Sequence, residues 1–303
     1  MNEKDRQPSI AKDQARGFGG SVVREPNDIL YTSNIADKVF FGIDCEIARV
    51  FGTSNHGAAV FIREATARMA PWSDHHSPAC HDIGVLRSKP EKAISEIIEI
   101  SALLAASNRI PILIGCDHTA SYAHALGTSV AEPSAYIYFD AHFDLGVHVP
   151  STTLHNGNFV AALLHSGRYE TALNIGGRSW TTHEPSYEDI SRFSTISALD
   201  SHNSIDDITA NLKPFFGKNV YVSIDADILD PAFAPNVCCP EPFGMSPKDL
   251  LALCSWIGLH CTVVGADLCE LVPAATSTQA EQVLLRCIHA LFPIKTPTDD
   301  NNA

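Results

Sequence analysis

The sequence lacks any apolar run long enough to cross a bilayer, and its first twenty residues, MNEKDRQPSIAKDQARGFGG, lack the apolar centre of a secretory signal. Basic residues are scarce, with 21 Lys and Arg against 35 Asp and Glu, for a net charge of −14. This balance argues against broad binding to nucleic acid or to an anionic membrane and suits a cationic ligand. We therefore expect a cytoplasmic protein with no nucleic-acid or membrane partner.

Paired short cysteine spacings, internal repeats and low-complexity linkers are also missing. The nine cysteines do not follow the spacing of structural zinc sites, and we expect most of them to be small buried hydrophobes. The 303 residues, 45% of them hydrophobic, can bury a full core. We interpret 1–303 as a single domain, with an N-terminal arm over about residues 1–25 and a C-terminal tail over about 295–303. Both segments are expected to be mobile or to be ordered only by a partner subunit.

Apolar runs of strand length alternate with segments of helical spacing. The runs are KVFFGI, IPILIG, AYIYF, TALNIG, NVYVSI and TVVGA, and the helical segments are EKAISEIIEISALLAAS, GNFVAALLHSG, SPKDLLALCSWIG and STQAEQVLLRCIHALF. Strands that alternate with helices imply crossover connections. The near-continuous hydrophobicity of the runs indicates burial on both faces. The sequence therefore predicts an α/β fold with a central, mainly parallel sheet.

Four of the predicted strands end in polar clusters at their carboxyl ends, where open parallel sheets bind ligands. The clusters are GCDHTAS with Asp117 and His118, DAHFD from Asp140 to Asp144, DADILDP from Asp225, and CELVP with Glu270. Their shared position predicts that they point toward one common site.

Alternation within two clusters predicts that Asp140, His142 and Asp144 share one face, as do Asp225 and Asp227. Neighbours on one strand face are roughly 6 to 7 Å apart, which suits two metals. Buried acids need compensating charge, and no Lys or Arg lies in the clusters.

Oxygen-rich ligation with some imidazole favours Mn²⁺ over zinc, with Ni²⁺, Co²⁺ and Fe²⁺ as alternatives. Two such ions can hold a bridging water as hydroxide against an electrophilic carbon. The competing interpretation is that each cluster is an ordinary set of strand-end caps and turn acids.

The motifs GCDHTAS, DAHFD and SIDADILDPAFAP resemble, in order and separation, those of the ureohydrolases, the arginase and agmatinase family. The resemblance runs from about FFGID to LFP and includes FGTSNHGAAVFIREAT. It implies the arginase-like three-layer α/β/α fold, two Mn²⁺ ions, release of urea from a guanidino compound, and a homo-oligomer, trimer or hexamer. The metal ligands that it implies are His118, Asp140, His142, Asp144, Asp225 and Asp227.

The same resemblance implies Asp144, His155 and Glu270 as catalytic residues. Glu270 would hold the planar guanidinium in a two-point fork. His155 would pass a proton to the departing amine. The family usually has Gly after this His, where Asn156 stands here, and the alternative is a histidine that caps the helix beginning near Asn158.

Departures from the family pattern concern the substrate. Free-arginine enzymes of the family carry Asp-x-Asp after the IGxR strand, and this sequence has Ser179 and Thr181 instead. A second departure is VCC at 237–239, where the family usually has Gly and Thr, and it leaves the shape of the pocket mouth undetermined. We expect a cationic alkylguanidine, such as agmatine or guanidinobutyrate, or a peptidyl arginine that would give ornithine. Candidate substrate-binding residues are His148, Asn158, Trp180, Thr181 and Glu270.

Three alternatives stay open from the sequence. The first two are a formimino hydrolase and an amide hydrolase on the same fold. The third is an inactive relative that retains metal and acts as a binding or regulatory subunit. The six ligands together with Glu270 argue against the inactive relative, and His155 argues against the formimino branch.

Overall fold

A nine-stranded sheet forms the centre of the protein. The computed structural model describes residues 16–24, 38–69, 80–146, 153–179, 190–198, 205–276 and 279–293. The strands are β1 Val22–Val23, β2 Lys38–Ile43, β3 Cys80–Leu86, β4 Ile110–Ile114, β5 Ala135–Phe139, β6 Thr171–Ile175, β7 Phe193–Ile196, β8 Asn219–Asp225 and β9 Thr262–Cys269. Their order is β1-β3-β2-β4-β9-β8-β5-β6-β7. Every pairing between neighbours is parallel, as predicted.

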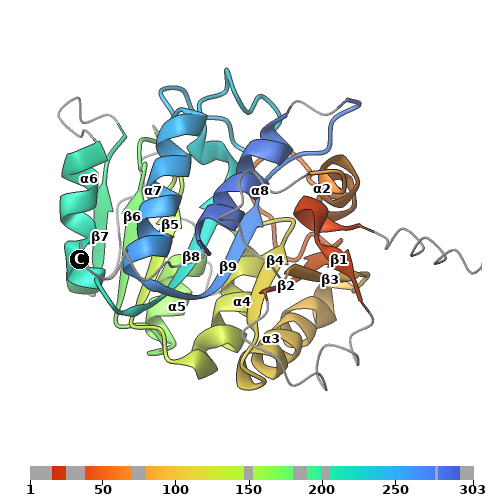
Figure 1. Ribbon diagram of the computed structural model, residues 1–303, viewed down its shortest axis with the longest axis horizontal. Coiled ribbons are helices and arrows are strands. Elements are labelled where there is room, and N and C mark those ends of the chain that lie inside the picture. The colour runs from red at the N-terminus through yellow and green to blue at the C-terminus, as the bar shows by residue number, and fades with distance from the viewer. Residues whose placement is uncertain are drawn as a thin grey trace, which may run out of the picture.

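Helices cover both faces of this sheet. They are α2 Ala58–Thr66, α3 Pro90–Ala106, α4 Thr119–Thr128, α5 Phe159–His165, α6 Ile205–Leu212, α7 Pro247–His260 and α8 Ala280–Ala290. Figure 1 shows α3, α4 and α5 on one side of the sheet and the other four helices on the opposite side. Val39 and Phe41 of β2 pack with α3 and α4, while Phe40 between them packs into the other layer. The three-layer α/β/α fold is therefore confirmed.

The six predicted strands and four predicted helices are present, and three strands were not predicted. β1 has only two residues, β3 contains the polar pair His81 and Asp82, and β7 is a four-residue edge strand. None of the three has the continuous apolar run that marks the central strands. Helix α7 begins where its sequence indicates, because Ser246 Oγ accepts the N–H of Asp249 and Pro247 occupies the first turn.

Residues 16–24 correct the interpretation of the first 25 residues as a mobile arm. Phe18 is fully buried, and β1 pairs with β3. The backbone N–H of Phe18 donates to Asp82 Oδ2, and that of Gly19 donates to Thr66 Oγ1, at 3.0 Å each. One buried aromatic ring and two hydrogen bonds, one buried and one partly buried, thus attach this segment to the core. The rest of the predicted arm and the predicted tail lie outside the described residues.

The cysteines agree with the expectation that most of them are small buried hydrophobes. All nine cysteines are free thiols, and eight of them are buried. No helix within the described ranges is both long and apolar enough to cross a membrane.

Candidate active site

The four strands with polar ends are neighbours in the sheet, in the order β4-β9-β8-β5. His118 follows β4 as the residue before α4, Glu270 follows β9, Asp225 ends β8, and Asp140 follows β5. Because the strands are parallel, their carboxyl ends lie along one edge of the sheet. The topology therefore brings together residues that are as far apart in the sequence as His118 and Glu270, 152 positions.

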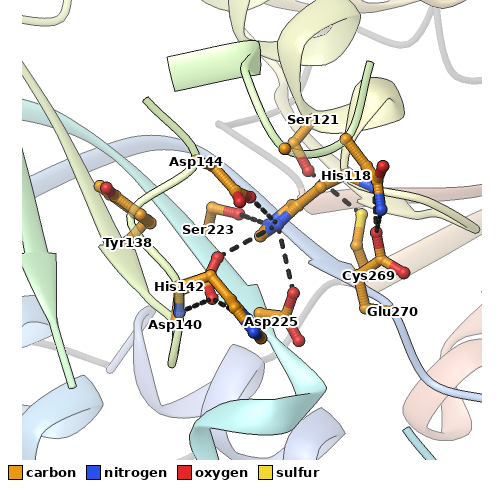
Figure 2. A network of polar contacts seen from close by, with 12 residues as sticks. His118, Ser121, Tyr138, Asp140, His142, Asp144, Ser223, Asp225, Cys269 and Glu270 are labelled. Atoms are coloured by element: carbon orange, nitrogen blue, oxygen red, sulfur yellow. Dashed lines mark hydrogen bonds and ion pairs between the residues drawn. The ribbon is translucent and has the colours of Figure 1, made fainter. Parts of the chain in front are cut away.

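His118 lies at the centre of the cluster (Figure 2). Its Nδ1 is 3.2 Å from both Asp140 Oδ2 and Asp225 Oδ2. The same nitrogen is 3.3 Å from Asp144 Oδ2. The ring packs against Phe159 of α5 with centroids 4.5 Å apart, and only 1% of the side chain is exposed. One imidazole nitrogen thus faces three carboxylates in a closed environment.

His142 forms the second half of the cluster. Its Nδ1 is 2.9 Å from Asp227 Oδ2 and 3.5 Å from Asp140 Oδ1. Its Nε2 is 3.6 Å from Glu241 Oε1, and 15% of the side chain is exposed. Asp140 therefore joins the two halves, with one oxygen toward each histidine.

The acids converge through turns, so strand alternation is wrong as the explanation. β5 ends at Phe139, and Asp144 has a φ of 49° in the following loop. Asp140 Oδ1 accepts the N–H of His142 at 2.6 Å, the side-chain-to-backbone bond by which Asp turns a chain. An extended strand would separate residues 140 and 144 by about 13 Å, whereas here both acids contact the same nitrogen.

The second acidic pair is arranged in the same way. Asp225 ends β8, and its Oδ1 accepts the N–H of Asp227 at 2.8 Å. Asp227 lies in the short 3-10 helix Ala226–Ile228, and its Oδ1 accepts the N–H of Ala141 at 3.0 Å. These bonds connect the end of β8 to the loop after β5.

The pKa shifts in this cluster follow from burial and from the crowding of negative charge. Burial raises the pKa of Asp144 to about 6, with the charge of Asp140 adding to the shift. Burial and neighbouring carboxylates raise the pKa of Asp225 well above its ordinary range. Burial opposes the charged form of Asp140 too, but the two histidines outweigh it and lower its pKa to about 2. The surrounding acids raise the pKa of both His118 and His142 although burial lowers it.

The donor set fits divalent cations. Three groups of atoms lie close enough to hold an ion: His118 with Asp140 and Asp144, Asp140 with His142 and Asp227, and His118 with Asp225 and Glu270. His118 Nδ1 and Asp140 Oδ2 are buried without a hydrogen bond, a state that is costly unless something pairs them. A cation between them would satisfy both atoms. All six predicted ligands thus belong to one connected cluster.

Glu270 extends the cluster toward β9 and has a strained backbone. Its φ of 64° lies in a region that costs a non-glycine residue about 1–3 kcal/mol. The N–H donates to the carbonyl of Cys116, and the carbonyl accepts the N–H of Cys238. Oε1 accepts the backbone N–H of His118 at 2.8 Å. Burial raises the pKa of Glu270 to about 7, with Asp117 adding to the shift and His118 opposing it.

Two asparagine amides also touch the Glu270 carboxylate, each at 3.4 Å: Asn55 at Oε2 and Asn156 at Oε1. Asn156 Oδ1 further accepts the N–H of Val50, and its Nδ2 donates to the carbonyl of Phe51. The residue that departs from the family pattern therefore ties the His155 loop to the 50–55 segment and to Glu270.

His155 is buried beside this junction. Its Nδ1 accepts the N–H of Gly157 at 3.1 Å, so the neutral ring carries its proton on Nε2. Burial lowers its pKa. The Asn158 amide makes two bonds within the loop, accepting the N–H of His155 and donating to the carbonyl of Thr153. Its predicted contact with substrate stays a prediction.

The structure describes only some of the predicted substrate-binding residues. His148, Trp180 and Thr181 lie outside the described residues. Ser179 is described, and its hydroxyl donates to Glu241 Oε1 at 2.9 Å. The departure at 179 therefore faces the carboxylate beside His142.

Sequence reasoning missed Asn55, Glu241 and Asp267. Asn55 lies in a segment already connected with the substrate side, and Asp267 is an acid inside an apolar strand, which is a usable signal. Glu241 carries no signal in the sequence, because its contact with His142 depends on how the 237–245 segment pairs with the residues that follow β8 and β9.

A model of the arginase family matches residues 36–291. The chain is 29% identical over 246 residues to an agmatinase of Halalkalibacterium halodurans, covering 78% of this chain and 84% of that protein. It is 28% identical to a formimidoylglutamase of Geobacillus thermodenitrificans, covering 71% and 70%. The solved proclavaminate amidino hydrolase of Streptomyces clavuligerus has the same fold, with a TM-score of 0.76 at 21% identity over 92% of this chain and 95% of that one.

Fold and family together define a hydrolase of the ureohydrolase class. The chain belongs to the arginase family, which confirms the resemblance seen in its motifs.

Proposed function

We propose that this protein hydrolyses the guanidino group of a cationic guanidine with two divalent metal ions, preferably Mn²⁺. One water and the guanidinium would give urea and a protonated amine, which balances atoms and charge. The observation that carries the proposal is the placement of the Glu270 carboxylate, which lies within the same acid and imidazole cluster as His118 and Asp225. A metal site with an adjacent buried carboxylate suits a cation that must be held against a nucleophile.

The proposed ligands divide into two positions that share Asp140. His118 and Asp144 would complete one position, and His142 and Asp227 the other, with Asp225 beside the first. When bound, the ions neutralise the carboxylates and lower the pKa of water, so that a nucleophile exists at neutral pH. Asp144, placed by its φ of 49°, would hold its oxygen at the first position.

The protein's own groups would orient the substrate and handle protons. Glu270 would accept two N–H groups of the planar guanidinium, taking the place of its present long contacts with Asn55 and Asn156. His155 would act as the imidazolium, which requires Nδ1 to take up a proton in place of the Gly157 contact. It would deliver its Nε2 proton to the departing amine nitrogen, become a neutral ring and regain a proton from water. Burial lowers the pKa of His155, which makes the imidazolium a stronger acid for this step.

Within this reaction, an alkylguanidine such as agmatine or guanidinobutyrate, or a backbone-blocked arginine, fits better than free arginine. An acid at position 179 or 181 would be needed to read a free α-amino group in the way the arginases do. Position 179 carries a serine whose hydroxyl is bonded to Glu241. The similarity to an agmatinase over 78% of the chain supports the same choice.

An assay of Mn²⁺-loaded protein tests the proposal. Urea release is measured for agmatine, guanidinobutyrate, free arginine and an arginine-containing peptide at equal concentration. We expect release from at least one guanidine, with free arginine the weaker substrate. No urea from any of them, in protein that holds two metals, would contradict the proposal.

Formimino hydrolysis is the second candidate, favoured by the 28% identity to a formimidoylglutamase. A formimino substrate in the same panel would release formamide in place of urea, so the product separates the two reactions.

A further inference from the structure

The Nε2 atom of His118 faces the core, on the side of the ring opposite the carboxylates. His118 Nε2 is 3.1 Å from Ser223 Oγ, and both side chains are buried (Figure 2). Ser223 lies two residues before Asp225 on β8. The imidazole therefore has a carboxylate side at Nδ1 and a hydroxyl side at Nε2.

Ser223 is itself bonded to a fully buried carboxylate on the adjacent strand. Asp267 of β9 is the register partner of Ser223, and its Oδ1 accepts the Ser223 hydroxyl at 2.7 Å. The same oxygen accepts the Ser121 hydroxyl from α4 at 2.8 Å, and Oδ2 accepts the Tyr221 hydroxyl. Tyr221 also contacts Nδ1 of the buried His124. Three hydroxyl donors thus converge on one carboxylate.

The direction of these hydrogen bonds determines the tautomer of His118. A serine hydroxyl has one proton, and Ser223 donates it to Asp267. Its oxygen can then only accept from the ring, so His118 Nε2 carries a proton. The lone pair of a neutral ring consequently lies on Nδ1, which faces the carboxylates. A proton on Asp267 Oδ2 would reverse the Tyr221 bond and leave this result unchanged, because Oδ1 would still accept from Ser223.

We infer that Asp267 is a positioning residue that acts through Ser223 to fix the tautomer and orientation of His118, so that Nδ1 is offered to a divalent metal. The inference rests on the metal site of the proposed function. Histidine ligands commonly donate their other N–H to such a partner, and its loss typically weakens metal binding or activity by about 10–100-fold. Neither Ser223 nor Asp267 needs to touch metal or substrate for this role.

The test measures Mn²⁺ affinity in two backgrounds that each leave one metal position. His142→Asn leaves the group around His118, and His118→Asn leaves the group around His142. Ser223→Ala is introduced into each, and binding is followed by competition with a chelating dye. We expect Ser223→Ala to weaken Mn²⁺ by about 10–100-fold in the His142→Asn background and to change nothing in the other.

Ser121→Ala is the matched control. It removes the same kind of donor from the same oxygen of Asp267, but the Ser121 hydroxyl bonds to Asp267 and Cys269 and not to the His118 ring. It should leave the Mn²⁺ affinity of both backgrounds unchanged. Equal losses from Ser121→Ala and Ser223→Ala, or equal losses in both backgrounds, would overturn the inference in favour of a general packing effect.

A second measurement covers the case in which Ser223→Ala does not fold. The ring ¹⁵N shifts of His118 in the intact Zn²⁺-loaded chain report which nitrogen keeps its proton. Protonated Nε2 with Nδ1 on the metal is expected, and the reverse would overturn the inference. Because both measurements follow metal and not urea, failure of guanidine hydrolysis alone would reject the proposed function and leave this inference standing.

Discussion

The two histidines of the candidate metal centre occupy contrasting surroundings. His118 is 1% exposed, with three carboxylates at Nδ1 and a buried serine at Nε2. His142 is 15% exposed, and its Nε2 is 3.6 Å from Glu241, whose side chain is 14% exposed. One half of the site is built into the core, and the other lies where solvent reaches it.

The two histidines therefore combine a closed environment with access to solvent in one site. The His118 side chain lies between β4, β8, β9 and α4, and its Nε2 contacts Ser223, which is hydrogen-bonded to Asp267. The His142 side chain comes from the loop after β5, where its backbone N–H donates to Asp140 Oδ1 and the neighbouring N–H of Ala141 donates to Asp227 Oδ1. We therefore expect the buried half to set the geometry and the open half to exchange metal faster.

The largest effect should follow from Asp140→Asn, because Asp140 belongs to both halves. Metal content should fall at both positions, and hydrolysis by about 100-fold or more, the scale for losing one electrostatic partner in a catalytic site. Elemental analysis and urea release measure the two effects. Asp206→Asn, an exposed acid on α6, serves as the control. Two metals in Asp140→Asn would disprove the shared position.

His155→Ala tests a residue that belongs to neither half. Metal content should stay at the level of the unmodified protein, while kcat falls by about 100-fold or more through loss of proton transfer. An unchanged kcat across the pH range would remove His155 from the proposed mechanism and return it to a loop-capping role.

Glu270→Gln should impair substrate and spare metal. The amide keeps the shape and an acceptor for the His118 N–H, but it loses the charge that pairs with guanidinium. A hydrogen bond to a charged group contributes about 1.5–3 kcal/mol, so kcat/KM should drop by about 10–100-fold. Unchanged kcat/KM, measured at saturating Mn²⁺, would place the guanidinium elsewhere.

Glu241→Gln acts on the open half alone. It should weaken the metal held with His142 by about tenfold at most and leave the His118 position as it is, because the 3.6 Å contact is longer than a hydrogen bond. When a chelator removes Mn²⁺ over time, the ion that leaves first should leave faster from the variant than from the unmodified protein. If the ion that leaves second is the one released faster, the assignment of the His142 half as the solvent-accessible half is wrong.

The residues of the predicted metal site could be picked out from the sequence because they lie in short contiguous motifs, and the structure brings these residues together in one cluster. The arrangement β4-β9-β8-β5, which makes the motifs one site, depends on crossovers and could not be derived from any motif. The Asp267 network was missed because its donors, Ser121, Tyr221 and Ser223, lie 44 to 146 residues away and meet it only through strand register and helix packing. Asn156 was noticed as a departure, but its contact with Glu270 needed the structure.

The last effect concerns the far end of the buried network and should appear in stability alone, as a pH dependence. His124 is completely buried, and burial lowers its pKa to about 3 from an ordinary value near 6.5. Below pH 6.5 His124 binds a proton in the unfolded chain but stays neutral in the folded chain. The free energy of unfolding therefore falls as the pH decreases.

His124→Asn removes the titration and keeps an N–H for the hydroxyl of Tyr221. From pH 7.5 to 5, the unmodified protein should lose about 2 kcal/mol more of its free energy of unfolding than the variant does. Urea unfolding of both proteins without metal measures the difference, since guanidinium chloride would itself compete for Glu270. Parallel pH curves for the two proteins would mean that His124 is protonated in the folded state, and the buried half of the site would then be less closed than its contacts indicate.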